Sequence, residues 1–475
     1  MNTGVMKKLK HLFWIGLAVS ILAGCGGGGN GSGGIGGGAQ TVDMDKVYFF
    51  VARDSVDIKG NNCIYATDGT SAGTFLVKSN ILSNVSQLKG ENLYAGKIYF
   101  AGGEYDDADP DVQLWVSDGT SAGTKLFKKL NNDYSSYPNY FTQMNGLLFF
   151  IAEDGSYDRL WVTDGTAAGT RVINNASGDI LDVKNHLKPV VAGNALYFFA
   201  ADAAHGFELW KTDGSQAGTV LVKDISPGSG DSGPLELTVY GNKVFFSCSV
   251  GVKTNLWVSD GTEAGTKILV KTRSDGDDNV SQLFASSTGL LFFRARNESN
   301  YEHLWVSNGA QDNATEIVLD GPTVSSYPQG FTEAGGLVYF VAFDNTHGYE
   351  LWVSNGTQAG TRMVKDIRPG TDGANLNSLR LKAMGNKIYF AADDGISGKE
   401  LWVSDGTEAG TVRVKDIYAG LFSSDAYLLK ALNNKLIFIA RDGTYGYEPW
   451  VSDGTEAGSI MLKDILSGDA GSFYF

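Results

Sequence analysis

Two acidic loops contain the residues best suited to bind a metal ion. Their aspartates are Asp106, Asp107, Asp109 and Asp111 in one loop, and Asp275, Asp277 and Asp278 in the other. Calcium favours several hard oxygen ligands from one flexible loop. The sequence therefore makes these aspartates calcium candidates, with a solvated acidic surface as the alternative, and no other cofactor is predicted.

Other reactive residue types are sparse and lack familiar catalytic spacing. The chain has no His-Glu-x-x-His motif and no closely paired cysteines, so a zinc site is not expected. Residues 230–233 are similar to the nucleophile segment of trypsin-like proteases, but Pro234 follows them in an expected loop, and we interpret the match as coincidence. Cys63 and Cys248 lie in different repeats and are expected to be free, buried thiols.

The composition fits a folded, acidic, exported protein. The 475 residues include 12% aromatic residues, enough for a core, which excludes disordered and collagen-like chains. Acidic residues outnumber basic ones 53 to 38, giving a net charge of −15. Such a surface repels nucleic acid and anionic lipid. We therefore expect no nucleic-acid partner.

The N-terminus has the pattern of an export signal. Lys7, Lys8 and Lys10 precede an apolar run at 12–23 that is too short for an ordinary membrane span. The run ends in Leu-Ala-Gly-Cys at 22–25, which resembles the lipobox of bacterial lipoproteins. The resemblance implies that residues 1–24 are removed, that Cys25 is lipidated, and that Gly26 directs the protein to the outer membrane. Residues 25–40 then form a Gly-rich tether, and the sequence leaves open whether the body faces the periplasm or the outside.

The remaining chain, 41–475, is one repeated unit. An Asp-Gly or Asn-Gly turn recurs nine times at intervals of 46 to 50 residues, at Asp68, Asp118, Asp164, Asp213, Asp260, Asn308, Asn355, Asp405 and Asp453. Repeats of this length are typical of solenoids, propellers and arrays.

Each repeat is expected to form four short strands. In the clearest copy these are 379–383, 387–392, 400–404 and 411–417. Their apolar runs do not alternate with polar residues, so both sheet faces must be covered, as in propeller blades. We predict an all-β, single closed β-propeller of nine four-stranded blades, with eight as the alternative because the copy at 308–310 is the weakest. The C-terminal 473–475 would complete the N-terminal blade.

Two motifs carry resemblances to known families. Glu400 to Thr407 resembles the ELWxxDGT repeat of bacterial exported proteins, which implies secretion and a repeat scaffold. Ala392 to Trp402 is similar to the tryptophan-docking motif of quinoprotein propellers, in which the indole packs on the neighbouring blade. We predict this role for the repeat tryptophans, rather than an aromatic ring for sugars: Trp115, Trp161, Trp210, Trp257, Trp305, Trp352, Trp402 and Trp450.

The Asp-Gly turns are interpreted as structural. Asp can accept hydrogen bonds from backbone N–H groups two residues on, and Gly supplies a positive φ. The turns resemble the Asp-boxes of sialidase-like propellers. Asn308 and Asn355 keep the accepting oxygen and lose the charge, which favours a turn over a calcium ligand. The aspartates assigned to this role are Asp118, Asp164, Asp213, Asp260, Asp405 and Asp453.

These features predict an outer-membrane lipoprotein whose propeller is a monomeric scaffold for binding or assembly. Its expected contacts are the membrane, through the lipid anchor only, and an unidentified protein or glycan. One alternative is a propeller glycosidase or lyase that acts on a glycan with acids in its rim loops. A weaker alternative is a quinoprotein-like dehydrogenase.

Overall fold

The computed structural model describes residues 42–53, 62–83, 92–104, 111–376, 380–469 and 471–473. Within these ranges the regular structure is strands and turns, with no α-helix. No helix there is long and apolar enough to cross a membrane. The signal and tether segments, including Cys25, lie outside the described residues.

The strands group into nine modules, one for each repeat. Module 1 comprises β1 (Tyr48–Ala52), β2 (Asn62–Thr67) and β3 (Phe75–Ser83). Module 2 comprises β4 (Leu93–Tyr94), β5 (Lys97–Glu104), β6 (Gln113–Ser117) and β7 (Lys125–Lys128). Module 3 comprises β8 (Asn139–Met144), β9 (Leu147–Glu153), β10 (Asp158–Thr163) and β11 (Arg171–Val172). Module 4 comprises β12 (Asp182–Val183), β13 (Val190–Ala192), β14 (Ala195–Ala201), β15 (Glu208–Thr212) and β16 (Val220–Lys223).

The remaining five modules have four strands each. Module 5 comprises β17 (Pro234–Tyr240), β18 (Lys243–Val250), β19 (Lys253–Ser259) and β20 (Lys267–Val270). Module 6 comprises β21 (Ser281–Ala285), β22 (Leu291–Arg296), β23 (Glu302–Ser307) and β24 (Thr315–Ile317). Module 7 comprises β25 (Gln329–Ala334), β26 (Leu337–Asp344), β27 (Gly348–Ser354) and β28 (Arg362–Lys365). Module 8 comprises β29 (Lys382–Met384), β30 (Lys387–Asp393), β31 (Lys399–Ser404) and β32 (Val412–Lys415). Module 9 comprises β33 (Tyr427–Leu432), β34 (Lys435–Ala440), β35 (Glu448–Ser452) and β36 (Ile460–Met461).

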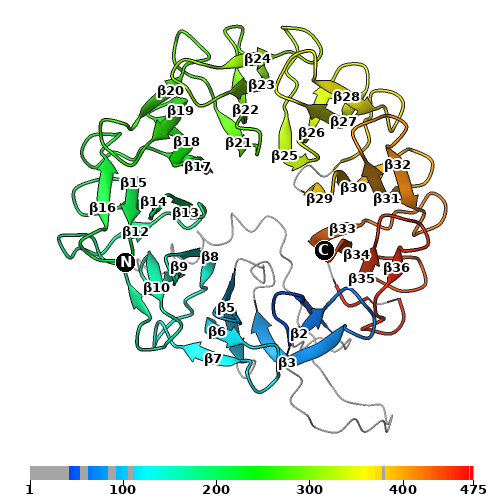
Figure 1. Cartoon of the computed structure of the whole chain (residues 1–475), viewed down its shortest axis with the longest axis horizontal. Helices are drawn as coiled ribbons and strands as arrows, with labels where there is room; N and C mark the ends of the chain where they lie inside the picture. The colour runs from blue at the N-terminus through cyan, green and yellow to red at the C-terminus, as the bar shows by residue number, and fades with distance from the viewer. Residues whose placement is uncertain are drawn as a thin grey trace, which may run out of the picture.

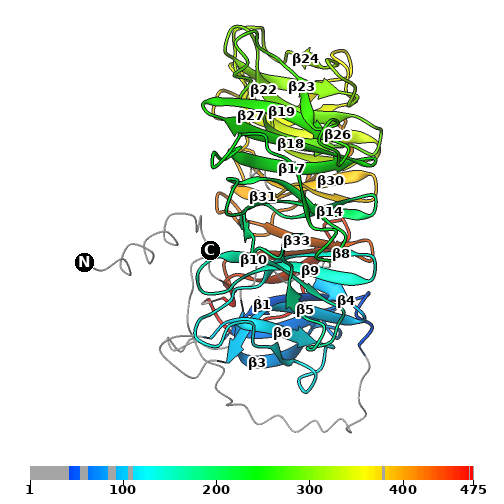
Figure 2. The ribbon, with the colours of Figure 1, turned by 90° about the vertical axis from the view of Figure 1, so that its left-hand side faces the viewer.

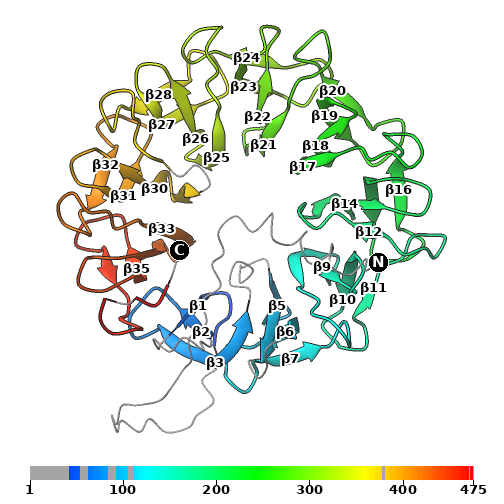
Figure 3. The same cartoon turned by 180° about the vertical axis from the view of Figure 1, so that it is seen from behind.

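The modules form a β-propeller. Modules 3 and 5 to 9 are each a four-stranded antiparallel sheet in which consecutive strands pair. The sheets follow one another around a common axis, and in these modules the first strand is innermost and the fourth outermost (Figures 1 and 3). Seen from the edge, the sheets stack beside one another (Figure 2). The unbroken apolar runs in the second and third strands are buried because neighbouring sheets cover both of their faces.

Two sheets depart from the expected four strands. The last residues of β3, Ile81 to Ser83, pair with β5, which joins modules 1 and 2 into one seven-stranded sheet. Module 4 has the additional short strand β12, which pairs with β14. Module 6, expected to be the weakest copy, has all four strands.

Apolar side chains from consecutive modules meet in shared clusters. In one of them Trp402, Phe390 and Ala392 of module 8 pack with Leu351 and Val353 of module 7. The same arrangement recurs for the other repeat tryptophans, each in a cluster with the module before it: Trp115, Trp161, Trp210, Trp257, Trp305, Trp352 and Trp450. Burying an indole removes a large apolar area from water, so these clusters hold neighbouring modules together.

Module 9 makes the same kinds of contact with module 1. Lys463 Nζ donates a hydrogen bond to the Thr74 carbonyl at 3.2 Å, as Lys415 Nζ does to Ser459 between modules 8 and 9 at 2.8 Å. The rings of Phe473 and Phe50 lie 6.1 Å apart. The Arg53 N–H also donates to the Ser472 carbonyl at 3.1 Å. Residues 474 and 475, expected to extend a strand here, lie outside the described part of the chain.

Each Asp-Gly turn is held by its own side chains. In module 8, Asp405 Oδ1 accepts hydrogen bonds from the Thr407 N–H at 2.9 Å and the Thr407 hydroxyl at 2.7 Å. Gly406 has a φ of +87°, where a residue with a Cβ is strained. A Cβ on Gly410 would lie about 2 Å from the Asp405 carboxylate. In the other modules the same side chain accepts a hydrogen bond from the backbone N–H two residues on: Asp68, Asp118, Asp164, Asp213, Asp260, Asn308, Asn355 and Asp453.

Candidate functional site

The calcium candidates that the structure describes do not form a metal site. Asp106, Asp107 and Asp109 lie outside the described residues. Asp111 forms an ion pair with Lys129 at 2.8 Å. Among the residues the structure describes, no three His, Cys, Asp or Glu side chains are grouped so that they could hold a metal ion.

The second acidic loop is occupied by internal contacts. Asp275 pairs with Arg273 at 2.5 Å, and Asp277 pairs with Arg296 at 3.3 Å. Asp278 is fully buried and accepts a hydrogen bond from Asn255 Nδ2 at 3.0 Å and two from backbone N–H groups. These side chains fix the loop between modules 5 and 6.

The two cysteines of the folded body differ. Cys248 is a buried free thiol, as the sequence predicts. Its pKa is raised by burial and then by the nearby Glu208. Cys63 is also buried, but it is disulfide-bonded, with the other half of the disulfide outside the described residues. The prediction of a free thiol at Cys63 was therefore wrong.

A buried polar residue that sequence reasoning missed begins the third strand of most modules. In module 8 it is Glu400, which is fully buried. Its carboxylate accepts hydrogen bonds from the N–H groups of Ile417 at 2.9 Å and Ser424 at 2.9 Å. The carboxylate thus holds the chain that leaves module 8 for module 9. Glu208, Glu350 and Glu448 occupy the same place in modules 4, 7 and 9.

Other modules fill this place with different polar side chains. In module 2, Gln113 Oε1 accepts the Leu130 N–H at 2.8 Å and the Ser136 hydroxyl at 3.1 Å. In module 3, Arg159 Nη1 donates to the Leu181 carbonyl at 2.9 Å. In module 6, His303 contacts Glu316 and the Val324 carbonyl. Since a carboxylate, an amide, a guanidinium and an imidazole all serve, the position holds loops and needs no particular reactivity.

The protease-like segment at 230–233 belongs to this same arrangement. The Ser232 hydroxyl is fully buried and donates a hydrogen bond to the Phe207 carbonyl at 2.6 Å. Asp231 Oδ1 accepts the Phe207 N–H at 2.9 Å. Both side chains therefore stabilise the loop rather than form a nucleophile.

Burial governs the protonation of the four glutamates. It raises the pKa of Glu208, Glu400 and Glu448 to about 7, although hydrogen bonds to their carboxylates act in the opposite direction. Burial raises the pKa of Glu350 further, to about 8. The difference has a visible cause. The Ser that bonds the carboxylate elsewhere (Ser232, Ser424, Ser472) is replaced in module 7 by Ala374, so Glu350 has only backbone N–H groups, those of Ile367 and Arg368, to lower its pKa.

Replacing Ala374 with Ser should repair this position. The new hydroxyl can donate to Glu350 Oε2, so we expect the free energy of unfolding to rise by about 1 kcal/mol and the pKa of Glu350 to fall. Urea unfolding checks the stability. The matched control is Ser424→Ala, which removes the equivalent bond and should lower stability by a similar amount. A destabilised Ala374→Ser variant would contradict the assignment.

Stability should fall as the pH rises through neutrality. Each of the four carboxyl groups has a pKa near 4.5 when unfolded and 7 to 8 when folded, so the folded state prefers the protonated form. This stabilisation is complete below the unfolded pKa and is lost as the pH rises through the folded pKa, by at least about 1 kcal/mol for each group. Urea unfolding across this range measures the loss. In a variant with Glu208, Glu400 and Glu448 changed to Gln the dependence should flatten, and an unchanged slope would refute the explanation.

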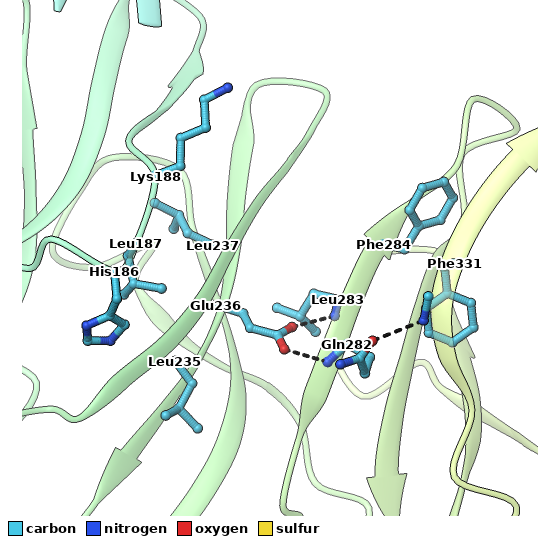
Figure 4. A pocket seen from close by; sticks show the side chains of 11 residues that line it. His186, Leu187, Lys188, Leu235, Glu236, Leu237, Gln282, Leu283, Phe284 and Phe331 are labelled. Carbon is cyan, nitrogen blue, oxygen red and sulfur yellow. Dashed lines mark hydrogen bonds between the residues drawn. The ribbon is translucent and has the colours of Figure 1, made fainter. Parts of the chain in front are cut away.

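A cavity of about 410 Å³ lies at the inner edge of modules 4 to 7. Its lining includes His186 and Lys188 before β13, Leu235 on β17, and Phe284 and Phe331 on β21 and β25. Figure 4 shows these side chains on neighbouring inner strands and on the segment before β13. The volume is within the range of small-ligand sites, and the lining combines apolar surface with a few polar groups.

Side chains on the inner strands also link one module to the next. The Glu236 carboxylate accepts hydrogen bonds from the N–H groups of Gln282 at 2.7 Å and Leu283 at 2.6 Å (Figure 4). The side-chain oxygen of Gln282 accepts the Gly330 N–H at 3.1 Å. The Glu236 carboxylate is therefore already engaged in hydrogen bonds to the backbone of module 6. The lining is suited to contact with a ligand rather than to acid–base chemistry.

The cavity is lined by residues that differ between repeats. Lys188, Glu236 and Gln282 each stand two residues before the residue that pairs with the equivalent aromatic side chain of the second strand (Tyr197, Phe245 and Phe292), and they are a cation, an anion and an amide. The turns and interface tryptophans, in contrast, are nearly the same in every repeat. The repeats are thus constant where they hold the fold and varied where they line this cavity.

A second cavity, of about 440 Å³, lies at modules 7 and 8. Tyr349, Arg368, Asp372 and Asn375 contribute to its lining. Arg368 pairs with Asp372 at 3.3 Å and with Asp393 at 3.2 Å. This cavity is more polar than the first.

One group of acids in module 3 lies on facing strands. Asp158 and Glu153 face each other on β10 and β9, and Asp182 lies nearby. Burial and these two neighbours raise the pKa of Asp158 to about 7. Sequence reasoning missed this residue because acids are common in every rim loop.

Comparisons with known proteins concern the fold alone. No family profile matches the sequence, and no curated protein matches it. Solved structures that are similar include a puromycin hydrolase (14% identity, TM-score 0.39) and a puromycin-hydrolysing peptidase of Mycobacterium tuberculosis (10%, 0.40). The alignments cover 75% and 70% of this chain, but 58% and 54% of those chains. The β-propeller domain of the Trilobed protease from Pyrococcus furiosus (12%, 0.35) is covered over 98% of its length, and over 70% of this chain.

Proposed function

We propose that the protein is a lipoprotein of the outer membrane whose propeller is a binding scaffold for a protein or glycan of the cell envelope. The observation that carries the proposal is the contrast between repeats. The repeated polar groups are used in internal hydrogen bonds, whereas the equivalent positions Lys188, Glu236 and Gln282, which line the cavity, differ between modules. A rigid frame with a varied lining is suited to recognition.

We further propose that the ring is closed and has nine blades. The support is the repetition of interior contacts between modules 9 and 1, in particular the hydrogen bond from Lys463 to Thr74 that matches the one from Lys415 to Ser459. Gly69 of module 1 also lies against Lys435 of module 9, as Gly406 lies against Leu337 of the module before it. Closure covers the apolar sheet faces of the first and last modules, which would otherwise be open to water.

The anchor is tested by labelling cells with a palmitate analogue. The processed protein should carry the label, and Cys25→Ser should lose both the label and the sedimentation with outer membranes.

The scaffold is tested by capture from envelope extracts with the full processed protein. We expect retention of a specific partner that is weakened by Phe284→Ala or Leu235→Ala at the cavity, and not by a change at an exposed outer strand such as Leu126→Ala. Turnover of a glycan or peptide without any stable partner would contradict the proposal.

A glycan-active enzyme is the second candidate. The observation that favours it is the raised pKa of Asp158 beside Glu153, because glycosidases pair a protonated carboxyl group with an ionised one. This reading predicts hydrolysis or elimination of an envelope glycan that is lost in Asp158→Asn.

A further inference from the structure

Three large apolar side chains are exposed on two segments that touch where module 8 meets module 9. Ile396, in the turn between β30 and β31, is 73% exposed. Leu421 and Phe422, in the loop between β32 and β33, are 78% and 61% exposed (the two strands are labelled in Figure 1). The turn and the loop are in contact, because a Cβ on Gly398 would lie 2.2 Å from the Phe422 carbonyl oxygen. Single exposed apolar residues are common on protein surfaces, whereas a group of neighbouring ones marks an interaction site. The three side chains are called the apolar patch below.

The apolar patch departs from the pattern of the repeats. Modules 4, 7 and 9 have a turn and an outgoing loop of the same length, with a positive-φ glycine at the place of Gly420: Gly228, Gly370 and Gly468. At the place of Ile396 these modules have Ala204, Thr346 and Thr444. At the places of Leu421 and Phe422 they have Ser229-Gly230, Thr371-Asp372 and Asp469-Ala470. Small or polar residues therefore suffice for this frame, and the fold does not account for three large apolar side chains at these places.

The apolar patch stands on a fixed backbone. The buried Glu400 carboxylate accepts hydrogen bonds from the N–H groups of Ile417 and Ser424, which lie on either side of Leu421 and Phe422 in the loop, each at 2.9 Å. The Phe422 ring stacks on Tyr418, with 4.8 Å between the ring centroids and 21° between their planes. A surface that is already ordered loses little conformational freedom when a partner binds.

Carboxylates outnumber basic groups beside the apolar patch. Its two arginines are each paired with an aspartate, at 3.6 and 2.9 Å: Arg413 with Asp416 and Arg441 with Asp425. Asp394 and Asp442, in the turns of modules 8 and 9, form no ion pair with a residue that the structure describes. They accept hydrogen bonds from the backbone of their own turns. The apolar surface is thus flanked by negative charge.

We propose that the apolar patch docks a short segment of a partner protein in which apolar side chains are flanked by lysine or arginine. The partner's apolar side chains leave water against Ile396, Leu421 and Phe422, and its cations lie near Asp394 and Asp442. A second copy of this chain would bring the same carboxylates to the contact, and an anionic lipid surface would bring its own negative charge, so repulsion disfavours both. The proposal depends neither on the lipid anchor nor on the cavity at modules 4 to 7.

A phage-displayed library of random dodecapeptides, selected on the full chain, tests the chemistry of the partner. The library is first depleted on a triple variant, Ile396→Thr, Leu421→Thr and Phe422→Ala, in which each position takes a residue that another repeat has there. We expect the selected peptides to combine apolar residues with a net positive charge, and to bind the triple variant at least tenfold more weakly in fluorescence anisotropy. Selection of neutral or acidic peptides, or of none that binds the full chain, overturns the proposal.

Two controls show whether a loss of binding is specific to the apolar patch. The triple variant changes only exposed side chains, so its urea unfolding should match that of the unchanged protein. Val252→Thr removes an apolar side chain that is 89% exposed in the equivalent turn of module 5, and it should leave peptide binding unchanged. Equal weakening by Val252→Thr would mean that the peptides recognise exposed apolar groups in general, which contradicts the proposal.

The charges are tested with Asp394→Asn and Asp442→Asn together. Asparagine keeps the oxygen that holds such a turn, as Asn355 does in its own. The double variant should bind the selected peptides several-fold more weakly, and the difference should disappear at roughly 0.5 M salt because the charges are then screened. Asp260→Asn, in an Asp-Gly turn of module 5, should have no effect. Unchanged binding in the double variant refutes the basic partner.

The other occupants are distinguished with phosphatidylcholine vesicles and by analytical ultracentrifugation. Vesicle binding that the triple variant reduces would assign the apolar patch to lipid, and self-association that it abolishes would assign the patch to a second copy. Either result overturns the proposal. Peptide binding that persists when capture from envelope extracts fails would refute the role of the cavity at modules 4 to 7 and leave the apolar patch as a separate site.

Discussion

Replacing Trp402 with Ala is expected to lower the free energy of unfolding by about 3–5 kcal/mol. The indole is 6% exposed and packs in one cluster with Phe390 of its own module and with Leu351 and Val353 of the module before it. Its removal leaves a cavity between two sheets that are held in place by the modules on either side. The cavity cannot collapse without moving whole modules, so the cost should be near the upper end for a large-to-small change.

The matched control is Trp402→Tyr. Module 1 has Tyr65 at the corresponding place, where the ring stacks on Phe50 with 5.7 Å between centroids. A tyrosine should therefore retain most of the packing and lose much less stability than alanine. Urea unfolding followed by far-UV circular dichroism gives both values. A loss in Trp402→Ala no greater than for an exposed side chain would contradict the interface role.

The fold could be predicted because its signals are local and repeated. Leu401, Trp402 and Val403 are consecutive apolar residues whose side chains point to alternate faces of β31. Both faces of this strand therefore had to be buried. The Asp405-Gly406 pair fixes a turn at the end of the same strand. These features depend on neighbours in the sequence, and nine copies make them unmistakable.

The loop contacts could not be predicted because they depend on distant backbone. Glu400 is the first residue of the Glu-Leu-Trp motif. Its carboxylate accepts hydrogen bonds from the N–H groups of Ile417 and Ser424, and Ser424 is 24 residues further along the chain. The available signal was a Glu before Leu-Trp with a Ser at that fixed distance. Ala374 departs from this pattern, and its consequence at Glu350 is visible only in three dimensions.

The calcium candidates also depend on contacts that the sequence does not reveal. Acidic composition alone made Asp275 and Asp278 look like ligands of one ion. The first pairs with Arg273 beside it, and the second turns inward to Asn255 of the preceding module. Which carboxylates remain free for a ligand depends on where the basic and amide side chains fall, and the sequence does not order them in space.

Replacing Glu448 with Ala should cost about 3–5 kcal/mol and should loosen the contact between the last and first modules. The buried carboxylate accepts hydrogen bonds from the Ile465 N–H at 3.0 Å and the Ser472 hydroxyl at 2.7 Å. Its removal leaves buried donors without partners. It also frees the segment whose Ser472 carbonyl accepts the Arg53 N–H of module 1.

Two control variants distinguish a loss of the contact between modules 9 and 1 from a general loss of stability. Glu448→Gln keeps an accepting oxygen, as Gln113 does in module 2, and should retain most of the stability. Glu400→Ala removes equivalent bonds inside the ring, where the chain continues into module 9, and should leave the contact with module 1 intact. Hydrogen exchange at the Arg53 amide reports this contact. Exchange should rise in Glu448→Ala and stay unchanged in Glu400→Ala, because only the former releases the C-terminal segment. Equal protection of Arg53 in both variants would mean that the ring does not depend on this segment for closure.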